Sequence, residues 1–416
     1  MNDRVADLIT YLDRSPSPWH AVASSRERLD GFEPLDELDE WTDVPARGYV
    51  VRGGALIAWS IPGVAAASTG FRIVGGHTDS PCLRVKPQPD VASVGWKQLG
   101  VEVYGGILNN TWLDRDLGIA GRVVTADGDH VDFASDRPIA RVPQLAVHLD
   151  RGVNDQGLTL DRQMHLTPVW GVGPAQHGEF AAWLADAAGL DGPVAWWDLC
   201  LHDVQPAAVI GADASMLTSA RLDNQLSCWA ATVALAAAAP SEQIAVIVLN
   251  DHEEVGSSST TGAQGPFLES VLERLVAGRG GSRDDLHRAL SASTCVSADN
   301  AHAVHPNYVE LHDPQHLPMI NAGPAIKINS NQRYATSSTT AAAFQFACEA
   351  ADVPWQVFVS RNNMPCGSTI GPLTATRLGI DTVDVGVPQL SMHSSRELCG
   401  VDDPVHLAAA LQVFLS

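Results

Sequence analysis

The chain has 416 residues, of which 45% are hydrophobic and 18% are charged, and its formal net charge is −22. These values are typical of a globular protein that is long enough for a large core and two domains. The acidic charge argues against nucleic acid and against an anionic membrane surface as partners, because both require clustered Lys and Arg.

The N-terminal part of the chain predicts one helix and two strands. Met1 to Asp13 has apolar residues at helical spacing, and it lacks the apolar segment of a secretory signal. Val50 to Ile61 and Gly70 to Val74 are apolar runs that predict strands, and the second run leads into the sequence GGHTDSP. We expect this polar sequence to lie in a loop at the end of a buried strand.

From about Asp90 to Ser215 the pattern changes to short β-like pieces separated by turns. The predicted strands are Trp96–Tyr104, Gly121–Thr125 and Val142–Leu149, and the one clear helical pattern is Glu179–Ala188. This segment therefore predicts an inserted, β-rich domain.

The C-terminal half alternates strands with helices. The predicted helices are Asn224–Ala239, Pro266–Ala277, Asp284–Leu290, Ser338–Ala351, Pro372–Leu378 and Pro404–Phe414. The predicted strands are Ile244–Leu249, Thr294–Asn300, Gln356–Val359 and Asp381–Pro388. Such alternation indicates an α/β fold with a mostly parallel sheet flanked by helices. We predict that residues 1–85 and 216–416 form this α/β domain and that residues 86–215 form the insertion.

The seven cysteines are scattered, with no CxxC pair and no spacing that suggests a disulfide framework. Such a set is typical of reduced thiols in the cytoplasm. No stretch approaches the ~20 apolar residues of a membrane span. The predicted protein is therefore cytoplasmic and has no membrane partner.

Acidic residues and histidines follow the predicted strands of the α/β domain or, in the case of Asp223, precede its alanine-rich helix. In an open parallel sheet, ligands bind beyond the carboxyl ends of the strands, so these side chains should share one edge. The set consists of His77, Asp79, Asp223, Glu253, Glu254, Asp299 and His393.

Carboxylates and imidazoles at one sheet edge are the ligands of a two-metal hydrolytic site that suits zinc or manganese. Such a site activates a water molecule and polarises a carbonyl oxygen, and it needs a separate carboxylate to take the proton of the water. Adjacent residues at a strand end point in different directions, so Glu254 can face a metal while Glu253 faces the water.

Each of these residues also has a purely structural interpretation. His77 could be a turn histidine, and Asp79 a turn cap or an acceptor for the imidazole of His77. Asp223 could cap the following helix, Asp299 could form an Asx-turn, and His393 could cap a helix. Only their joint occurrence at strand edges favours the metal site.

With these residues in place, the chain resembles the aspartyl aminopeptidases, the M18 family of metallopeptidases. The resemblance rests on stretches that keep their order almost from end to end: VGGHTDSPCLRVKP, QLAVHLDRGVN, SARLDNQLS, NDHEEVGSSSTTGA, SADNAHAVHPNY, GPAIKINSNQRYAT, RNNMPCGSTIGP and VGVPQLSMHSSRE. The middle segment away from QLAVHLDR matches only loosely.

The resemblance implies an enzyme that removes N-terminal Asp or Glu from short peptides. It implies two divalent ions, for which zinc is the expected metal and manganese and cobalt are the alternatives. The implied ligands are His77, Asp223 and Asp299 for one ion, and Asp223, Glu254 and His393 for the other, so that Asp223 bridges. Glu253 would be the general base, and Asp79 would orient His77.

Further implications concern the substrate and the assembly. Lys327, one of only three lysines, would bind the acidic side chain of the substrate, although it could also be a surface residue. His148 would reach the active site of a neighbouring subunit; the alternative is a satisfied histidine within a strand. The loop around Gly367 would offer backbone N–H groups, or it could be an ordinary helix start. The inserted domain would build a homo-oligomer, a dodecamer of dimers with enclosed active sites.

Two other functions remain open at this point. One is a metalloaminopeptidase of broad or neutral specificity on the same scaffold. The other is a catalytically silent shell that carries cargo or supports assembly, which the full set of ligands and base argues against. A serine hydrolase is disfavoured, because GSSS and GSTIG do not form a GxSxG elbow.

Overall fold

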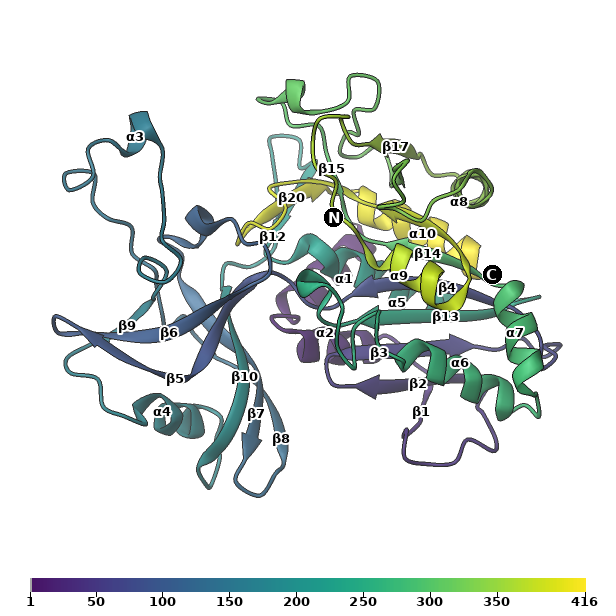
Figure 1. Ribbon diagram of the computed structural model, residues 1–416, viewed down its shortest axis with the longest axis horizontal. Helices are drawn as coiled ribbons and strands as arrows, with labels where there is room; N and C mark the ends of the chain where they lie inside the picture. The colour runs from purple at the N-terminus through teal and green to yellow at the C-terminus, as the bar shows by residue number, and fades with distance from the viewer. Residues whose placement is uncertain (1) are drawn as a thin grey trace.

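The computed structural model describes residues 2–416, and it divides visibly into two lobes (Figure 1). One lobe is built around a nine-stranded sheet and carries both chain termini. The other lobe is built around a six-stranded sheet and carries a long excursion that holds the short helix α3 (Val153–Gln156).

The nine-stranded sheet is mixed, with parallel strands at its centre. Its order is β1 (Glu33–Pro34), β2 (Arg47–Arg52), β3 (Ala55–Ser60), β13 (Ile244–Asn250), β4 (Phe71–His77), β14 (Thr294–Ala298), β18 (Asp381–Gly386), β16 (Ala325–Ile328) and β17 (Gln356–Val359). Strands β13, β4, β14 and β18 pair in parallel, so their carboxyl ends open at the same edge. This confirms the predicted α/β fold.

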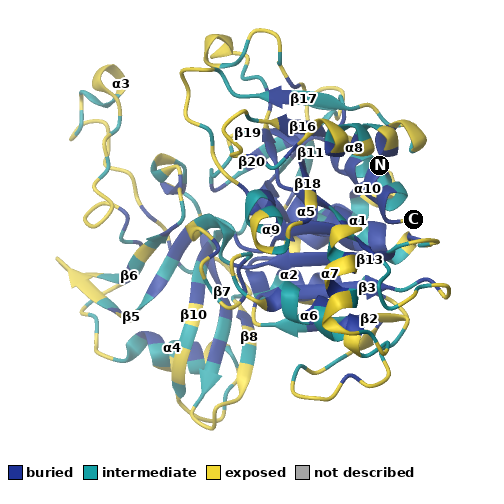
Figure 2. Cartoon of the chain, turned by 45° about the vertical axis from the view of Figure 1, so that its right-hand side comes forward, coloured by how far each residue is buried: buried dark blue, intermediate teal, exposed yellow. Residues whose placement is uncertain are grey.

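Helices cover both faces of this sheet, which explains why its central strands are apolar throughout. Along β13, Val246 and Val248 face a core shared with α6 (Phe267–Ala277) and α7 (Arg283–Ser291), while Ile247 faces the opposite core. The second core is shared with α1 (Asp3–Asp13), α2 (Pro18–Arg26), α5 (Leu222–Ala237), α8 (Ser338–Ala350) and α10 (Asp403–Leu415). Figure 2 shows the central strands dark with burial between these layers. The remaining helix, α9 (Ile370–Leu378), packs on β18.

A small five-stranded sheet lies beside the end of the large one. Its order is β11 (Ala208–Ile210), β12 (Met216–Ser219), β20 (Glu397–Gly400), β19 (Pro388–Leu390) and β15 (Ala301–His302). Because β12 directly precedes α5 and β19 leads to β20 through a short loop, this sheet holds two polar loops against the carboxyl edge of the large sheet.

The six-stranded sheet is antiparallel throughout. Its order is β8 (His130–Ala134), β7 (Leu117–Thr125), β10 (Val194–Asp203), β5 (Cys82–Ser93), β6 (Trp96–Tyr104) and β9 (Val169–Val172). Helix α4 (Glu179–Ala187) packs on it through Phe180 and Trp183, whose rings contact Trp170 and Trp197. The lobe thus has an aromatic core of its own.

Two predicted strands are wrong in detail. Val50–Ile61 is not one strand but the hairpin of β2 and β3, which turns at Gly53 with a φ of 56°. Val142–Leu149 is not a strand: Val142 makes only an isolated bridge to Leu113, and the residues that follow are exposed loop and turn. Their alternating apolar side chains imitate a strand but face solvent.

Within residues 2–416, no helix is long and apolar enough to cross a membrane.

Candidate metal centre

The residues of the candidate site come from separate elements that end at one edge of the large sheet. His77 is the last residue of β4, and Asp299 follows β14 directly. Glu253 and Glu254 lie in a short 3-10 turn after β13. Asp223 lies in the first turn of α5, where its backbone is not helical, and His393 lies between β19 and β20.

These elements bring two sets of three donor residues together. His77 Nε2 lies 3.7 Å from Asp223 Oδ1 and 4.0 Å from Asp299 Oδ1. His393 Nε2 lies 3.4 Å from Asp223 Oδ2 and 3.4 Å from Glu254 Oε2. In each set, one donor atom per residue lies within 4.8 Å of the others, and the two sets share Asp223. His77, Glu253 and Glu254 form a third set by the same measure.

The electrostatics show that this cluster needs positive charge. Burial would lower the pKa of His393, but the hydrogen bond with Asp223 and the charge of Glu254 outweigh it and raise the pKa to about 10. The pKa of His77 is likewise raised, against its burial, by Asp79 and the neighbouring carboxylates. Burial raises the pKa of Glu254 and of Asp299. Protons on the site thus supply charge that metal ions could supply instead.

The same residues fit a pair of divalent ions. Asp223 Oδ1 and Glu254 Oε1 are buried and have no hydrogen-bond partner within residues 2–416. An unpaired carboxylate oxygen in the interior is costly unless a cation contacts it. Imidazole nitrogens and carboxylate oxygens in sets of three are also the donors that zinc uses in catalytic sites.

Asp79 fixes both the first histidine and the two glutamates. Its carboxylate lies 3.4 Å from His77 Nδ1. It also accepts hydrogen bonds from the backbone N–H groups of Glu253 at 3.0 Å and Glu254 at 3.1 Å, and from the Tyr104 hydroxyl at 2.6 Å. One buried carboxylate therefore holds the turn that presents the adjacent glutamates. Burial raises the pKa of Glu253 to about 7, with His77 opposing and the neighbouring carboxylates reinforcing the shift.

Glu397 has a positioning role that the sequence did not reveal. Its carboxylate accepts hydrogen bonds from the backbone N–H of His393 at 2.7 Å and of Asp223 at 2.9 Å. It therefore ties two candidate ligands to β20. The only sequence signal was its place four residues after His393, which does not distinguish it from a surface glutamate.

A cavity of about 420 Å³ opens in front of the cluster, and Lys327 and Gly367 line it. Lys327 is only 2% exposed, and its Nζ donates to the backbone carbonyls of Asp299 at 2.8 Å and Asn300 at 3.0 Å. Its ammonium also lies 5.0 Å from the centre of the Tyr334 ring. At Gly367 a Cβ would meet no atom within 4 Å, so the cavity is open there.

His148 does not join the cluster within the chain. It lies on the exposed loop after Val142, next to the exposed apolar side chains of Val147 and Leu149. The alternative of a satisfied histidine within a strand is wrong, because this segment is not a strand.

Comparisons with known proteins show the family to which the chain is similar. A family model described as "Aminopeptidase I zinc metalloprotease (M18)" matches residues 11–415. The "Probable M18 family aminopeptidase 2" of Streptomyces coelicolor is 55% identical over 98% of this chain and 96% of its own. Among solved structures, the "Cryo-EM structure of the Ape4 and Nbr1 complex" matches with a TM-score of 0.94 at 34% identity, covering 99% of this chain and 85% of that one.

The "Structure of S. cerevesiae mApe1 dodecamer" matches with a TM-score of 0.85 at 28% identity, over 99% of this chain and 96% of that one. The full-length family match and the close relative agree on one assignment. The chain belongs to the M18 family of zinc metallo-aminopeptidases.

Proposed function

We propose that this aminopeptidase uses two metal ions to remove N-terminal Asp or Glu from short peptides. The observation that carries the acidic specificity is Lys327, a buried ammonium that lines the substrate cavity of a protein with few lysines. Two of its three N–H groups are used by backbone carbonyls, and its nearest carboxylate oxygen, on Asp299, is 3.9 Å away. The third N–H is available to a substrate carboxylate.

The proposed metal ligands are the two sets that share Asp223. His77, Asp223 and Asp299 would hold one ion, and Asp223, Glu254 and His393 the other. Bound there, the ions would anchor the free α-amine, polarise the scissile carbonyl and acidify a water molecule. Zinc is the proposed metal, with manganese or cobalt as alternatives.

The remaining residues would handle protons and position groups. The carboxylate of Glu253 would take the proton of the attacking water and deliver it to the leaving amine nitrogen. Asp79 would orient the imidazole of His77 and hold the backbone of both glutamates. The backbone around Gly367, just before α9, would face the bound substrate.

The assembly is part of the proposal. Residues 1–85 and 216–416 would form the α/β aminopeptidase domain. Residues 86–215, which supply nearly all of the six-stranded sheet, would form the oligomerisation domain. His148, on its exposed apolar loop, would complete the site of a neighbouring subunit in a homo-oligomer, a dodecamer of dimers. The seven cysteines are all free thiols, which fits a cytoplasmic location.

A matched peptide panel tests the function. Peptides that differ only in their first residue, Asp, Glu, Ala or Leu, are compared with the wild type and with Lys327→Met. We expect turnover of the Asp and Glu peptides, and a loss of roughly 10–100-fold in kcat/KM for these peptides in the variant, because a hydrogen bond to a charged group is lost. Lys86→Met, at a lysine of the six-stranded sheet, is the control and should retain full activity.

The panel also separates the alternatives. Turnover of Ala and Leu peptides that Lys327→Met leaves unchanged would support a broad-specificity aminopeptidase and contradict the acidic preference. Bound metal with no turnover of any peptide would support a silent shell.

A further inference from the structure

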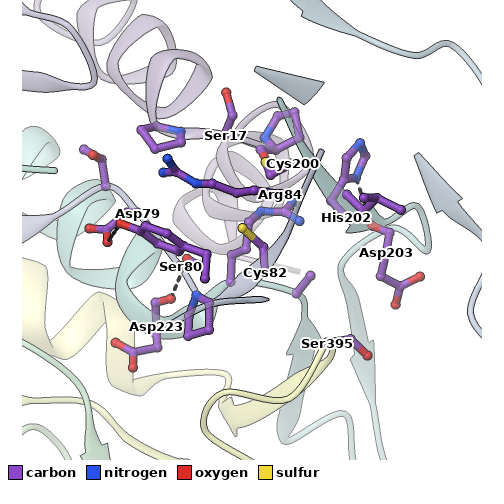
Figure 3. A pocket seen from close by; sticks show the side chains of 18 of the residues that line it. Ser17, Asp79, Ser80, Cys82, Arg84, Cys200, His202, Asp203, Asp223 and Ser395 are labelled. Atoms are coloured by element: carbon purple, nitrogen blue, oxygen red, sulfur yellow. Dashed lines mark hydrogen bonds between the residues drawn. The ribbon is translucent and has the colours of Figure 1, made fainter. Parts of the chain in front are cut away.

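A second cavity lies beside the metal centre and shares Asp79 and Asp223 with it (Figure 3). Its walls come from the segment before α2, from β5 and β10 of the six-stranded sheet, and from the residues that lead into α5. Its volume is about 40 Å³, compared with about 420 Å³ for the cavity in front of the metal centre. It therefore has room for only a few heavy atoms. We call it the arginine pocket, defined by Arg84, Trp112, His202 and Arg221.

Two arginines face this pocket without a carboxylate partner. Within residues 2–416, the side chain of Arg84 makes no hydrogen bond and no ion pair. Its guanidinium lies 3.9 Å from the centre of the Tyr104 ring. Arg221 donates only to backbone carbonyls, from Nε to Ser15 at 3.0 Å and from Nη2 to Leu12 at 3.4 Å. Its Nη1 is buried and has no partner in the described chain. In a chain with 48 acidic and 26 basic residues, such arginines call for an explanation.

Two further polar groups in the pocket also lack partners. The indole Nε1 of Trp112 is a buried donor without an acceptor in residues 2–416, and His202 Nε2 is buried without a partner in the same range. Burial lowers the pKa of His202 to about 3, so its imidazole is neutral. Because Nδ1 lies 3.2 Å from the backbone carbonyl of Asp203 and must donate to it, Nε2 is left as an acceptor.

The carboxylates on the pocket wall are engaged elsewhere. Asp79 is held by His77, Tyr104 and two backbone N–H groups. Asp203 accepts from the backbone N–H of Gln205 and lies 3.6 Å from Arg115. Asp198 is exposed at the rim. Glu397 accepts from the backbone N–H groups of Asp223 and His393, and Asp223 faces His77 and His393 of the metal centre. Asp203 Oδ2 is buried without a hydrogen bond, but it is the atom that lies 3.6 Å from Arg115. The other groups left over in the pocket are N–H donors of Arg84, Arg221 and Trp112, with His202 Nε2 as a neutral acceptor.

We propose that the arginine pocket binds a small oxyanion that carries a hydrogen, of the size of bicarbonate. Its oxygens accept from Arg84, Arg221 Nη1 and Trp112 Nε1, and its hydroxyl donates to His202 Nε2. Guanidinium groups suit oxyanions because their N–H donors form a planar fork. A volume of about 40 Å³ has room for roughly three water-sized groups, so an anion with three oxygens fits it better than phosphate or sulfate, which have four.

The pocket and the metal centre share a wall, so occupancy should reach the metal site. Asp79, Ser80 and Asp223 line the pocket. The Ser80 hydroxyl donates to the backbone carbonyl of Asp223 at 2.8 Å, drawn as a dashed line between these two residues in Figure 3. Tyr104 lies under the guanidinium of Arg84 and donates to Asp79. An anion in the pocket would order the end of β4 and the residues after it, which carry His77 and Asp79.

Thermal unfolding of the metal-loaded, full-length protein tests the site. Sodium bicarbonate, bromide and sulfate are titrated at fixed pH and ionic strength. At saturation we expect bicarbonate to raise Tm by about 4 °C, bromide to raise it less because it cannot donate to His202, and sulfate to have no effect. Arg84→Met should abolish the bicarbonate shift, and Arg84→Lys should retain part of it. Arg141→Met, at a surface arginine paired with Asp114 and Asp116, should keep the full shift.

Crystals soaked in bromide give an independent readout that needs no variant. We expect an anomalous peak within hydrogen-bonding distance of Arg84 and Arg221. A Tm that follows ionic strength alone, equally in the wild type and Arg84→Met, would overturn the proposal. A pocket that holds only water in the crystal would overturn it as well, and a bromide peak without a bicarbonate shift would mark an adventitious ion only.

Discussion

The metal centre and the arginine pocket lie next to each other, and their unpaired groups carry opposite charge. The metal centre presents carboxylate oxygens without cations, whereas the arginine pocket presents N–H donors without anions. Asp79, Ser80 and Asp223 line the pocket and belong to the loops of the metal centre. The comparison teaches that a cluster of buried unpaired groups with one sign of charge points to a ligand of the opposite sign.

Metal removal should have the largest effect and should separate the two sites. Chelation should reduce peptidase activity to background and lower Tm by about 5 °C, because the folded state loses bound cations that the unfolded chain cannot hold. The bicarbonate shift in Tm should persist in the chelated protein, since its donors are Arg84, Arg221 and Trp112. Restored zinc should recover the activity. Full activity in the presence of chelator would contradict the two-metal proposal.

Glu253→Gln tests the base within the metal centre. It should lower kcat by roughly a thousandfold, since the amide cannot take the proton of the water. Metal content, measured by plasma mass spectrometry, should not change, because Glu253 is not one of the proposed ligands. Glu273→Gln, on the surface of α6, is the matched control. A variant that keeps more than about a tenth of the wild-type kcat would rule out Glu253 as the base.

Asp384→Asn tests how the substrate cavity is held together. This buried carboxylate on β18 accepts from Thr369 Oγ1 at 2.5 Å and from the backbone N–H of Ala335 at 2.6 Å. Asp384 therefore holds the segments around Ala335 and Thr369 against β18. Lys327 lies opposite Asp384 on the neighbouring strand, β16.

Loss of one of these hydrogen bonds should raise KM for acidic peptides about tenfold and leave kcat within about twofold. Asp381→Asn, at the exposed start of the same strand, should change neither value. Equal losses in kcat for acidic and neutral peptides would instead indicate a general disturbance of the site.

The sequence predicted which residues lie together better than it predicted the contacts that hold them. His77, Glu254 and Asp299 follow strands of one parallel sheet, and the carboxyl ends of such strands converge by topology alone. Tyr104, Asp384 and Glu397 could not be predicted in this way. Each acts through a contact between distant segments, such as Glu397 with Asp223, and these contacts depend on strand register and loop path.

The fold shows the same limit. The α/β rhythm after Asn224 predicted the large sheet, because alternating apolar strands and helices have few other solutions. Val142–Leu149 has the alternation of a strand but no neighbour to pair with. The pattern of a strand specifies its faces but not the presence of a partner strand.

Tyr104 offers the smallest but most discriminating test, because its two ends belong to different sites. The hydroxyl donates to Asp79 on the metal side, and the ring lies under Arg84 on the pocket side. Tyr104→Phe removes only the hydroxyl. It should lower the free energy of unfolding by about 1–2 kcal/mol and reduce kcat/KM a few-fold, since Asp79 keeps its two backbone donors.

The bicarbonate shift in Tm should survive in Tyr104→Phe. Tyr104→Leu also removes the ring and should weaken that shift, because the guanidinium of Arg84 loses the aromatic face that holds it in place. Denaturant unfolding, peptide kinetics and the bicarbonate titration measure the three effects separately. If both variants changed the bicarbonate response equally, the hydroxyl would act on both sites, and the wall between them would have to be regarded as one cooperative unit.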